Sequence, residues 1–232
     1  MIPVSEVFGP TIQGEGPYAG RQAMFIRLGG CNLSCSWCDT PYTWDASRFD
    51  LRQEIVARDV QKVLAEMDAM TELVVITGGE PLLHAKSAGF EELLRGLSEM
   101  GKSVHIETNG TITPPDRVLS LVSVFVISPK LENAGAHKLG QSPLLAKGWP
   151  DIARRHESHL KYVCESAQDV YAAAQRARSV DWPINRVWVM PEGMTKLQLD
   201  TRWPTILQAA LEVGVNATSR LHVLAWGDVR GR

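Results

Sequence analysis

Three of the chain's four cysteines lie within eight positions, in the segment GGCNLSCSWCDT. Cys31, Cys35 and Cys38 are separated by three residues and then by two. Thiolates at such close spacing bind zinc, iron or iron–sulfur clusters. The spacing therefore predicts a metal centre in residues 29–40, which we call the cysteine loop.

Four kinds of site compete for these cysteines. A disulfide would leave one thiol unpaired and would need an oxidising compartment. A structural zinc ion takes four ligands, and the next candidates are the distant His84, His105 and Cys164. Three inert buried thiols are hard to explain by packing in a glycine-flanked turn. Three thiolates that leave one iron open suit a [4Fe–4S] cluster that also binds a substrate or cofactor. Zinc with a distant ligand stays an alternative, and Cys164 is assigned no role.

Short apolar runs alternate with helix-period segments along the chain. The runs are rich in β-branched and aromatic residues, as expected of strands buried on both faces. We expect strands at 23–28, 73–77, 103–107, 124–128, 160–164, 186–190 and 221–225. We expect helices at 60–67, 90–97 (capped by Gly101), 166–179 and 201–214, the last with Pro204 near its start. This alternation predicts an α/β fold with a parallel sheet or barrel in a single domain, residues 1–232.

Polar and glycine-rich residues follow five of the expected strands. The cysteine loop follows the first, and the others are followed by TGGEP (77–81), ETNGT (107–111), SPK (128–130) and MPEG (190–193). The carboxyl ends of parallel strands meet at one rim, where α/β barrels hold their active sites. Each segment alone could be a turn, but together they favour a shared site.

The composition excludes several classes of protein. Hydrophobic residues at 44% and charged residues at 22% are typical of a globular protein. Lys and Arg number 24 against 26 Asp and Glu, so the net charge indicates neither a nucleic-acid nor a membrane partner. No stretch approaches the ~20 apolar residues of a membrane span, and the N-terminus lacks the pattern of a secretory signal. Four cysteines are too few for a disulfide framework, and we expect a cytoplasmic protein.

The C-x3-C-x2-C spacing with an aromatic residue before the last cysteine resembles the radical S-adenosylmethionine (SAM) superfamily. TGGEP resembles the superfamily's glycine-rich motif. The resemblance implies an incomplete parallel (βα) barrel of about six strands. It also implies a [4Fe–4S] cluster on Cys31, Cys35 and Cys38 that binds SAM and cleaves it to a 5′-deoxyadenosyl radical. The SAM-binding residues expected on this basis are Trp37, Cys38, Asp39, Gly79, Glu80, Glu107, Asn109, Ser128, Pro129, Lys130 and Glu192.

Within that superfamily the chain resembles the 7-carboxy-7-deazaguanine synthase family. The family has a short N-terminal strand and then QGEG (here 13–16), RLGGC (27–31), CDT (38–40), TGGEP, ETNGT and SPK in this order. The resemblance is firm over residues 1–130, and from 131 onward only the late strand pattern supports it. It implies contraction of 6-carboxy-5,6,7,8-tetrahydropterin to 7-carboxy-7-deazaguanine with loss of ammonia, as in a carbon–nitrogen lyase of the queuosine pathway. It further implies a homodimer and an external electron donor of the flavodoxin or ferredoxin type.

The same resemblance assigns substrate and magnesium contacts. The substrate-binding residues are Ile12, Gln13, Gly14, Glu15, Arg27, Thr77 and His222, and Thr40 is a ligand of Mg²⁺. In this assignment Glu15 accepts two parallel N–H bonds from the amino-pyrimidine, and Arg27 pairs with the substrate carboxylate. MPEG stands where the family commonly has a glutamine–proline pair, so Glu192 could contact SAM in a different way.

Each assignment has a structural alternative. Arg27 could form a structural ion pair, Gln13 and Glu15 could fix a turn, Thr40 could cap a turn, and His222 could be a core residue on the last strand. A glycyl-radical activating enzyme shares the cysteine spacing, but it acts on a protein and has no need for QGEG or Arg27. A non-enzymatic zinc or iron–sulfur module is the remaining alternative.

Overall fold

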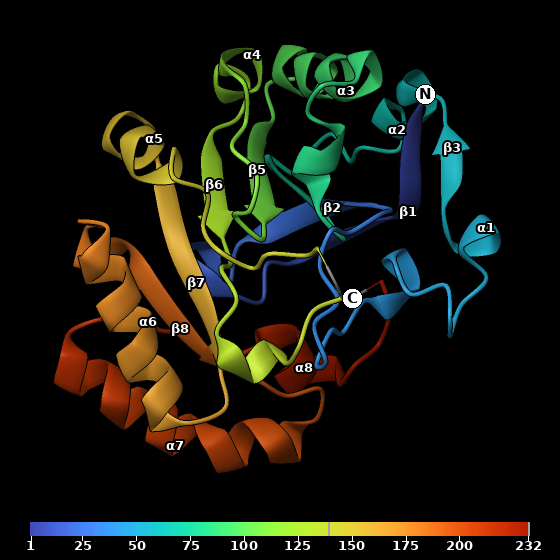
Figure 1. The fold of residues 1–232 in the computed structure, drawn as a ribbon. Helices are drawn as coiled ribbons and strands as arrows, with labels where there is room; N and C mark the ends of the chain where they lie inside the picture. The colour runs from blue at the N-terminus through green and yellow to red at the C-terminus, as the bar shows by residue number, and fades with distance from the viewer. Residues whose placement is uncertain (139, 232) are drawn as a thin grey trace.

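The computed structural model describes residues 1–138 and 140–231. Within them, nine strands form one sheet in the order β3-β1-β2-β4-β5-β6-β7-β8-β9 (Figure 1). The strands are β1 (Ile2–Ile12), β2 (Gln22–Leu28), β3 (Val56–Arg58), β4 (Leu73–Gly78), β5 (Ser103–Thr108), β6 (Val124–Ile127), β7 (Ser158–Cys164), β8 (Val187–Pro191) and β9 (Asn216–Ala217).

The sheet is parallel from β2 through β4 to β9, whereas β1 is antiparallel to both β2 and β3. The helices are α1 (Leu51–Glu54), α2 (Val60–Leu64), α3 (Ala88–Glu99), α4 (Asp116–Leu119), α5 (Trp149–Arg155), α6 (Ala167–Ser179), α7 (Lys196–Val213) and α8 (Leu221–Trp226). Figure 1 shows α3 to α7 on the outside of the curved sheet, whose edges are β3 and β9. The predicted incomplete (βα) barrel is confirmed. None of the described helices is long and apolar enough to cross a membrane.

The core explains why the strands lack polar alternation. Leu73 to Ile76 of β4 are all fully buried, because one face of the strand lies under helices and the other lies inside the barrel. Helix α3 presents Phe90, Leu93, Leu94 and Leu97 to the sheet. Ser87 caps this helix by accepting a hydrogen bond from the backbone N–H of Phe90.

The prediction of a strand at 221–225 is wrong, because these residues form helix α8. The place next to β8 in the sheet is taken by the two-residue strand β9, and the later apolar run instead begins with the backbone N–H of Leu221 donating to Gly14 O of the QGEG loop. Val223 is buried while Leu221 is 39% exposed, so the run also lacks the alternation of a half-buried strand. His222 therefore lies on a helix and not on a strand.

Two smaller expectations also need correction. Helix α7 begins at Lys196, where Thr195 and Gln198 form a capping box, so Pro204 lies inside the helix and not near its start. Pro204 is exposed on the outer side of the helix. The N-terminal strand is not short, because β1 runs for 11 residues.

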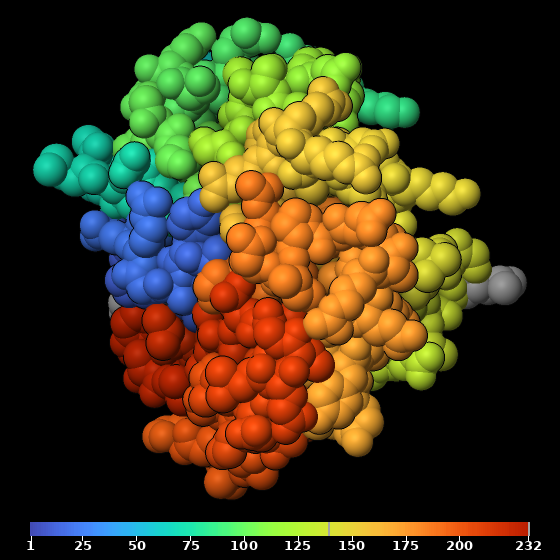
Figure 2. All heavy atoms as spheres, turned by 90° about the vertical axis from the view of Figure 1, so that its left-hand side faces the viewer, coloured from blue at the N-terminus to red at the C-terminus, as the bar shows by residue number. Residues whose placement is uncertain are grey.

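The QGEG loop after β1 and the segment that leads into α8 lie side by side. In Figure 2 the blue N-terminal segment lies next to the dark red C-terminal segment. The backbone N–H of Leu221, the first residue of α8, donates to Gly14 O at 3.0 Å, and Gly16 N donates to Thr218 Oγ1 at 3.0 Å. Helix α8 therefore packs directly on the QGEG loop that follows β1.

Candidate active site

One cavity opens at the carboxyl ends of the parallel strands, beside the cysteine loop. Its walls collect most of the residues that the sequence indicated. They are Ile12, Gln13, Gly14, Glu15, Arg27, Cys31, Cys35, Trp37, Cys38, Asp39, Thr40, Thr77, Gly79, Glu107, Asn109, Ser128, Lys130 and His222. Glu80, Pro129 and Glu192 are predicted residues that are not part of this wall.

Strand register brings the inward-facing polar residues together. Arg27 on β2 pairs directly with Thr77 on β4, and the Thr77 hydroxyl donates to Glu107 Oε2 on β5 at 3.0 Å. Gln13 Nε2 donates to the other carboxylate oxygen of Glu107 at 3.2 Å. Because these residues all lie near strand ends on the inner face, they line one side of the cavity as a continuous polar row.

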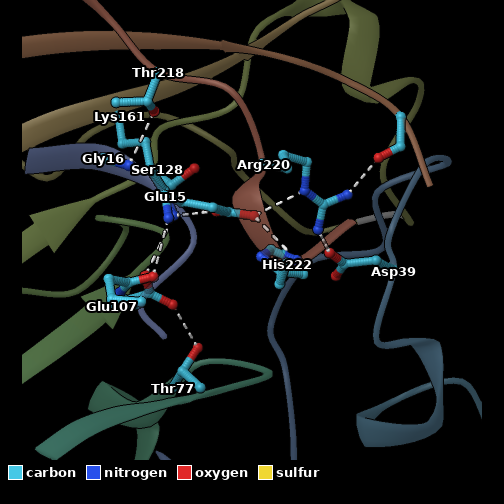
Figure 3. A network of polar contacts seen from close by, with 12 residues as sticks. Glu15, Gly16, Asp39, Thr77, Glu107, Ser128, Lys161, Thr218, Arg220 and His222 are labelled. Atoms are coloured by element: carbon cyan, nitrogen blue, oxygen red, sulfur yellow. Dashed lines mark hydrogen bonds and ion pairs between the residues drawn. The ribbon is translucent and has the colours of Figure 1, made fainter. Parts of the chain in front are cut away.

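The QGEG loop is anchored by a mostly buried carboxylate. Glu15 lies between two cations, with Lys161 Nζ 2.6 Å from its Oε2 and Arg220 Nε 2.8 Å from its Oε1 (Figure 3). Lys161, on β7, also reaches Glu107 Oε1 at 3.3 Å. Lys161 therefore connects the QGEG loop to the polar row of Thr77 and Glu107.

Arg220 connects the QGEG loop to two further segments. Besides Glu15, its guanidinium donates to Asp39 of the cysteine loop and to the carbonyl of Gly193 at 2.7 Å, as Figure 3 shows for Asp39. Arg220 is the residue before α8 and is 6% exposed, and its charge is compensated mainly by Glu15 and Asp39. A buried guanidinium with several acceptors is a rigid connection, since its planar donors fix the partners' positions.

Burial and pairing set the protonation states of this network. Burial alone would raise the pKa of Glu15, but Lys161 and Arg220 hold it well below its usual range. Burial would lower the pKa of Lys161, and the carboxylates of Glu107 and Glu15 raise it instead. Burial lowers the pKa of His222, against the attraction of Glu15. At neutral pH the network therefore contains charged Glu15 and Lys161 beside a neutral imidazole.

The cysteine loop packs on the TGGEP turn through glycines. A Cβ on Gly79 would lie 2.0 Å from Gly30 O and 2.9 Å from Cys31 Cβ, so no other residue fits there. Gly79 N donates to Leu28 O at 3.1 Å, and Glu80 N donates to Gly30 O at 2.8 Å. This close backbone contact holds Cys31 at the mouth of the cavity.

Glu80 has a structural position beneath the site. It is fully buried and accepts hydrogen bonds from Thr108 Oγ1 (2.7 Å), Asn109 N (2.6 Å) and Leu82 N (2.9 Å). Its carboxylate thus ties the TGGEP turn to the ETNGT turn. Glu192 is also turned away, because it pairs with Arg202 of α7.

Lys130 and Asn109 face the cysteine loop from neighbouring strand ends. Lys130 Nζ donates to Ser128 Oγ at 3.0 Å and lies 5.3 Å from the centre of the Trp37 ring. Asn109 Nδ2 donates to Asn32 Oδ1 at 2.8 Å. These groups surround the three cysteines with donors and one cation.

Arg27 combines a fixed position with free donors. Its Nε donates to Glu6 Oε1 on β1 at 2.5 Å, and the Tyr42 hydroxyl donates to the same oxygen at 2.9 Å. Among the described residues Nε is the only nitrogen of this guanidinium that makes a hydrogen bond. Both Nη atoms therefore remain available for a ligand in the cavity.

Thr40 and His222 line the cavity near Glu15 and Cys38. Thr40 precedes the 3₁₀ turn Pro41–Thr43 but makes no side-chain capping bond, and its hydroxyl lies 3.7 Å from Cys38 Sγ. His222 Nε2 lies 3.9 Å from Glu15 Oε1. A Cβ on Gly14 would come 2.0 Å from His222 Nδ1, so the ring needs glycine at that position.

Comparison with known proteins identifies the family. The model of the Radical SAM superfamily matches residues 25–134. A 7-carboxy-7-deazaguanine synthase of Pyrobaculum aerophilum is 36% identical, over 100% of this chain and 97% of its own. The Bacillus subtilis synthase is 40% identical, over 99% and 98%.

The chain belongs to the 7-carboxy-7-deazaguanine synthase family. The crystal structure of QueE from Escherichia coli has the same fold, with a TM-score of 0.66 at 23% identity, over 95% of this chain and 94% of that chain. The predicted family is confirmed, and the protein is a radical SAM lyase of the queuosine pathway. This membership implies a [4Fe–4S] cluster and SAM.

The residues present fit such a cluster. All four cysteines are free, and Cys31, Cys35 and Cys38 line the cavity together while Cys164 lies in the hydrophobic core. Burial raises the pKa of the Cys31 thiol to about 12, and bound iron would be required to hold it as a thiolate. Among the described residues no group of three His, Cys, Asp or Glu side chains is close enough together to hold a single metal ion. Thiolates of a cluster bind different irons, and the donor set here is the soft one that iron–sulfur clusters take.

Sequence reasoning missed Lys161 and Arg220. Lys161 lies within a strand, and Arg220 follows β9 in a segment without a recognised motif. A charged residue inside the apolar run LKYVC was a signal, since an unpaired lysine is rarely buried in a strand. No signal distinguished Arg220 from other arginines.

Removing Lys161 should destabilise the protein strongly. Lys161→Met keeps the aliphatic stem but leaves Glu107 and one oxygen of Glu15 without their buried cation. We expect the free energy of unfolding at pH 7 to fall by about 3 kcal/mol, the lower end for a broken buried pair, because Arg220 remains on Glu15. Urea unfolding measures this, and Lys62→Met, an exposed lysine of α2, should change it by less than about 0.5 kcal/mol.

The free energy of unfolding that Lys161→Met loses should become smaller as the pH falls. The pKa of Glu15 is lowered by folding, so its stabilisation is complete above the unfolded value, about 4.3, and disappears as the pH falls through the folded value. The difference between wild type and Lys161→Met should therefore shrink between pH 7 and pH 3.5. A difference that stays constant or grows in acid would show that Glu15 is not the partner through which Lys161 acts.

Proposed function

We propose that this protein converts 6-carboxy-5,6,7,8-tetrahydropterin to 7-carboxy-7-deazaguanine with loss of ammonia. The observation that carries the proposal is the convergence of Glu15, Glu107 and Arg27 on one cavity beside the three cysteines. A pterin carboxylate has an amino-pyrimidine edge rich in N–H donors and an anionic group. The two carboxylates match the first feature, and the arginine matches the second.

The amino-pyrimidine edge would lie against Glu15 and Glu107. Both carboxylates pair with Lys161 Nζ, so their oxygens are oriented as acceptors before a ligand arrives. Gln13 and Thr77 fix the orientation of Glu107, which supports a place for Glu107 on the substrate side and not beside SAM. Ile12, Gly14 and the neutral His222 would complete the contacts with the ring.

The substrate carboxylate would bind Arg27. Its free Nη atoms can form two parallel hydrogen bonds to a carboxylate, while Glu6 holds the rest of the guanidinium in place. Thr40, whose hydroxyl also faces the cavity, would contribute one ligand to a Mg²⁺ ion on the same carboxylate. Magnesium commonly takes few protein ligands and keeps water or substrate oxygens.

The SAM side of the cavity would be formed by the cysteine loop and the later strand ends. Cys31, Cys35 and Cys38 would hold the cluster, and Trp37, Asp39, Gly79, Asn109, Ser128 and Lys130 would surround SAM. Pro129, Glu80 and Glu192 would act only through these neighbours. Cluster and SAM supply hydrogen-atom abstraction from the substrate when they are bound. The product differs from the substrate by ammonia alone, so no net oxidant is needed and SAM can be regenerated.

The electron for SAM cleavage must come from outside the chain. We propose a protein donor of the flavodoxin or ferredoxin class as the redox partner. We also propose the cytoplasm as the compartment, because four free cysteines are kept as thiols most readily under reducing conditions.

Product formation tests the reaction. Anaerobically reconstituted protein given the pterin carboxylate, SAM, Mg²⁺ and a reductant should form 7-carboxy-7-deazaguanine and ammonia in equal amounts, measured by mass spectrometry. Cys31→Ala should abolish the product and Cys164→Ala should retain it, since only Cys31 lines the cavity. Removal of Mg²⁺ by chelation should slow the reaction. SAM cleavage without deazapurine would instead indicate a different substrate.

Substrate binding tests Arg27. Arg27→Ala should weaken pterin binding by about two orders of magnitude or more, because an anion loses a charge-assisted partner worth roughly 2–5 kcal/mol. Reductive SAM cleavage without substrate should persist in this variant. Arg21→Ala, which removes an exposed arginine paired with Glu72, is the control and should bind the pterin normally. Equal loss of SAM cleavage and pterin binding would assign Arg27 to the fold instead.

The open barrel supports a homodimer. Its edges β3 and β9 are not joined, and α7, on the face shown in Figure 2, exposes Leu197 (76%) and Leu211 (69%). We expect light scattering to give about twice the 25.6 kDa chain mass. A mass of one chain at working concentration would contradict the dimer.

A further inference from the structure

The indole of Trp44 is hydrogen-bonded to a cysteine of the cysteine loop. Trp44 Nε1 donates to Cys38 Sγ at 3.3 Å, and Trp44 lines the same cavity as the three thiols. The 3₁₀ turn Pro41–Thr43 reverses the chain after Cys38, and Trp44 N donates to Pro41 O at 3.1 Å. This turn returns the indole to the sulfur six residues earlier in the sequence.

A cation lies over the same ring. Lys138 Nζ is 5.4 Å from the centre of the Trp44 ring, and Lys138 is exposed. Its segment is held on the cysteine loop, because Lys138 N donates to Ser34 Oγ at 3.1 Å and Ser34 N donates to His137 Nδ1 at 3.2 Å. A cation over the ring face withdraws electron density from the indole and strengthens its N–H as a donor.

Trp37 provides an internal comparison. It also lines the cavity, and Lys130 lies 5.3 Å from its ring centre. Its buried Nε1, however, has no hydrogen-bond partner among the described residues. The two tryptophans therefore share a burial environment and a neighbouring lysine, but only the N–H of Trp44 reaches a sulfur.

We propose that Trp44 is a positioning residue for the cluster, which acts through Cys38 and raises the cluster's reduction potential. The proposal rests on the family's cluster and not on the pterin substrate. A reduced cluster carries one more negative charge, part of it on the thiolate sulfurs, so an N–H donor to Cys38 stabilises the reduced form more than the oxidised form. The Thr40 hydroxyl, at 3.7 Å from the same sulfur, is a weaker donor by distance.

The midpoint potential of the cluster-loaded protein, measured without SAM or pterin, tests this proposal. Trp44→Phe keeps an aromatic ring under Lys138 but removes the N–H. We expect its potential to fall by about 59 mV, which is tenfold in the one-electron reduction equilibrium. Trp37→Phe is the matched control and should shift by less than a third of that. Iron content and the visible absorption band confirm that both variants hold an intact cluster.

A second pair of variants covers the case in which Trp44→Phe does not load iron. Lys138→Met leaves the indole in place and should lower the potential in the same direction by a smaller amount. Lys147→Met removes another exposed lysine of this segment and controls for general charge, so it should shift the potential less than Lys138→Met. An unchanged potential in Trp44→Phe, or equal shifts in the two tryptophan variants, overturns the proposal. If only Lys138→Met and Lys147→Met bind the iron–sulfur cluster, equal shifts of the potential in these two variants overturn the proposal. Product formation in wild type is unaffected by either result, so the proposed reaction is tested separately.

Discussion

The ion pairs of the mostly buried Glu15 carboxylate are the interactions on which the site depends most. This carboxylate receives Lys161 from β7 and Arg220 from the start of α8, and these two cations reach on to Glu107 and Asp39. The two buried cations are stable only beside their carboxylates, because removing a carboxylate leaves a buried charge without its partner. The QGEG loop, the late strands, the C-terminal helix and the cysteine loop are therefore held in one arrangement by a single electrostatic network.

The same network has a functional consequence for ligands. Glu15 and Glu107 are oriented before a ligand binds by their contacts with Lys161, so a pterin would meet preformed acceptors and little side-chain entropy would be lost on binding. The cysteine loop is positioned by a different means, the close backbone contact of Gly79 with Gly30. The QGEG side and the cysteine-loop side of the cavity thus have separate supports that meet at Arg220 and Asp39. This separation explains why Arg27 and Cys31 can be tested independently.

Residues far apart in sequence complete the cavity in ways that a motif search does not find. Lys161 and Arg220 were not predicted, because their partners are 146 and 205 residues away and no local pattern indicates such pairs. Glu192 was expected beside SAM, but it pairs with Arg202. The segment 221–225 was predicted as a strand, since an apolar run of five residues suits either a strand or a helix. Only the folded chain decides between them, since Leu221 N donates to Gly14 O of the QGEG loop and the segment forms α8.

The sequence by itself determined the family, the three cysteines that line the cavity, six of the parallel strands and most of the cavity wall. Those features depend on local signals: cysteine spacing, glycines at strand ends, and apolar runs buried on both faces. Tertiary structure decided which polar residues pair, which carboxylates are held ionised, and which tryptophan donates to a cysteine sulfur. These depend on distances and burial between segments that come together only in the folded chain. The sequence specifies the chemical type of each residue, whereas the fold determines its hydrogen-bond or ion-pair partner and the dielectric around it.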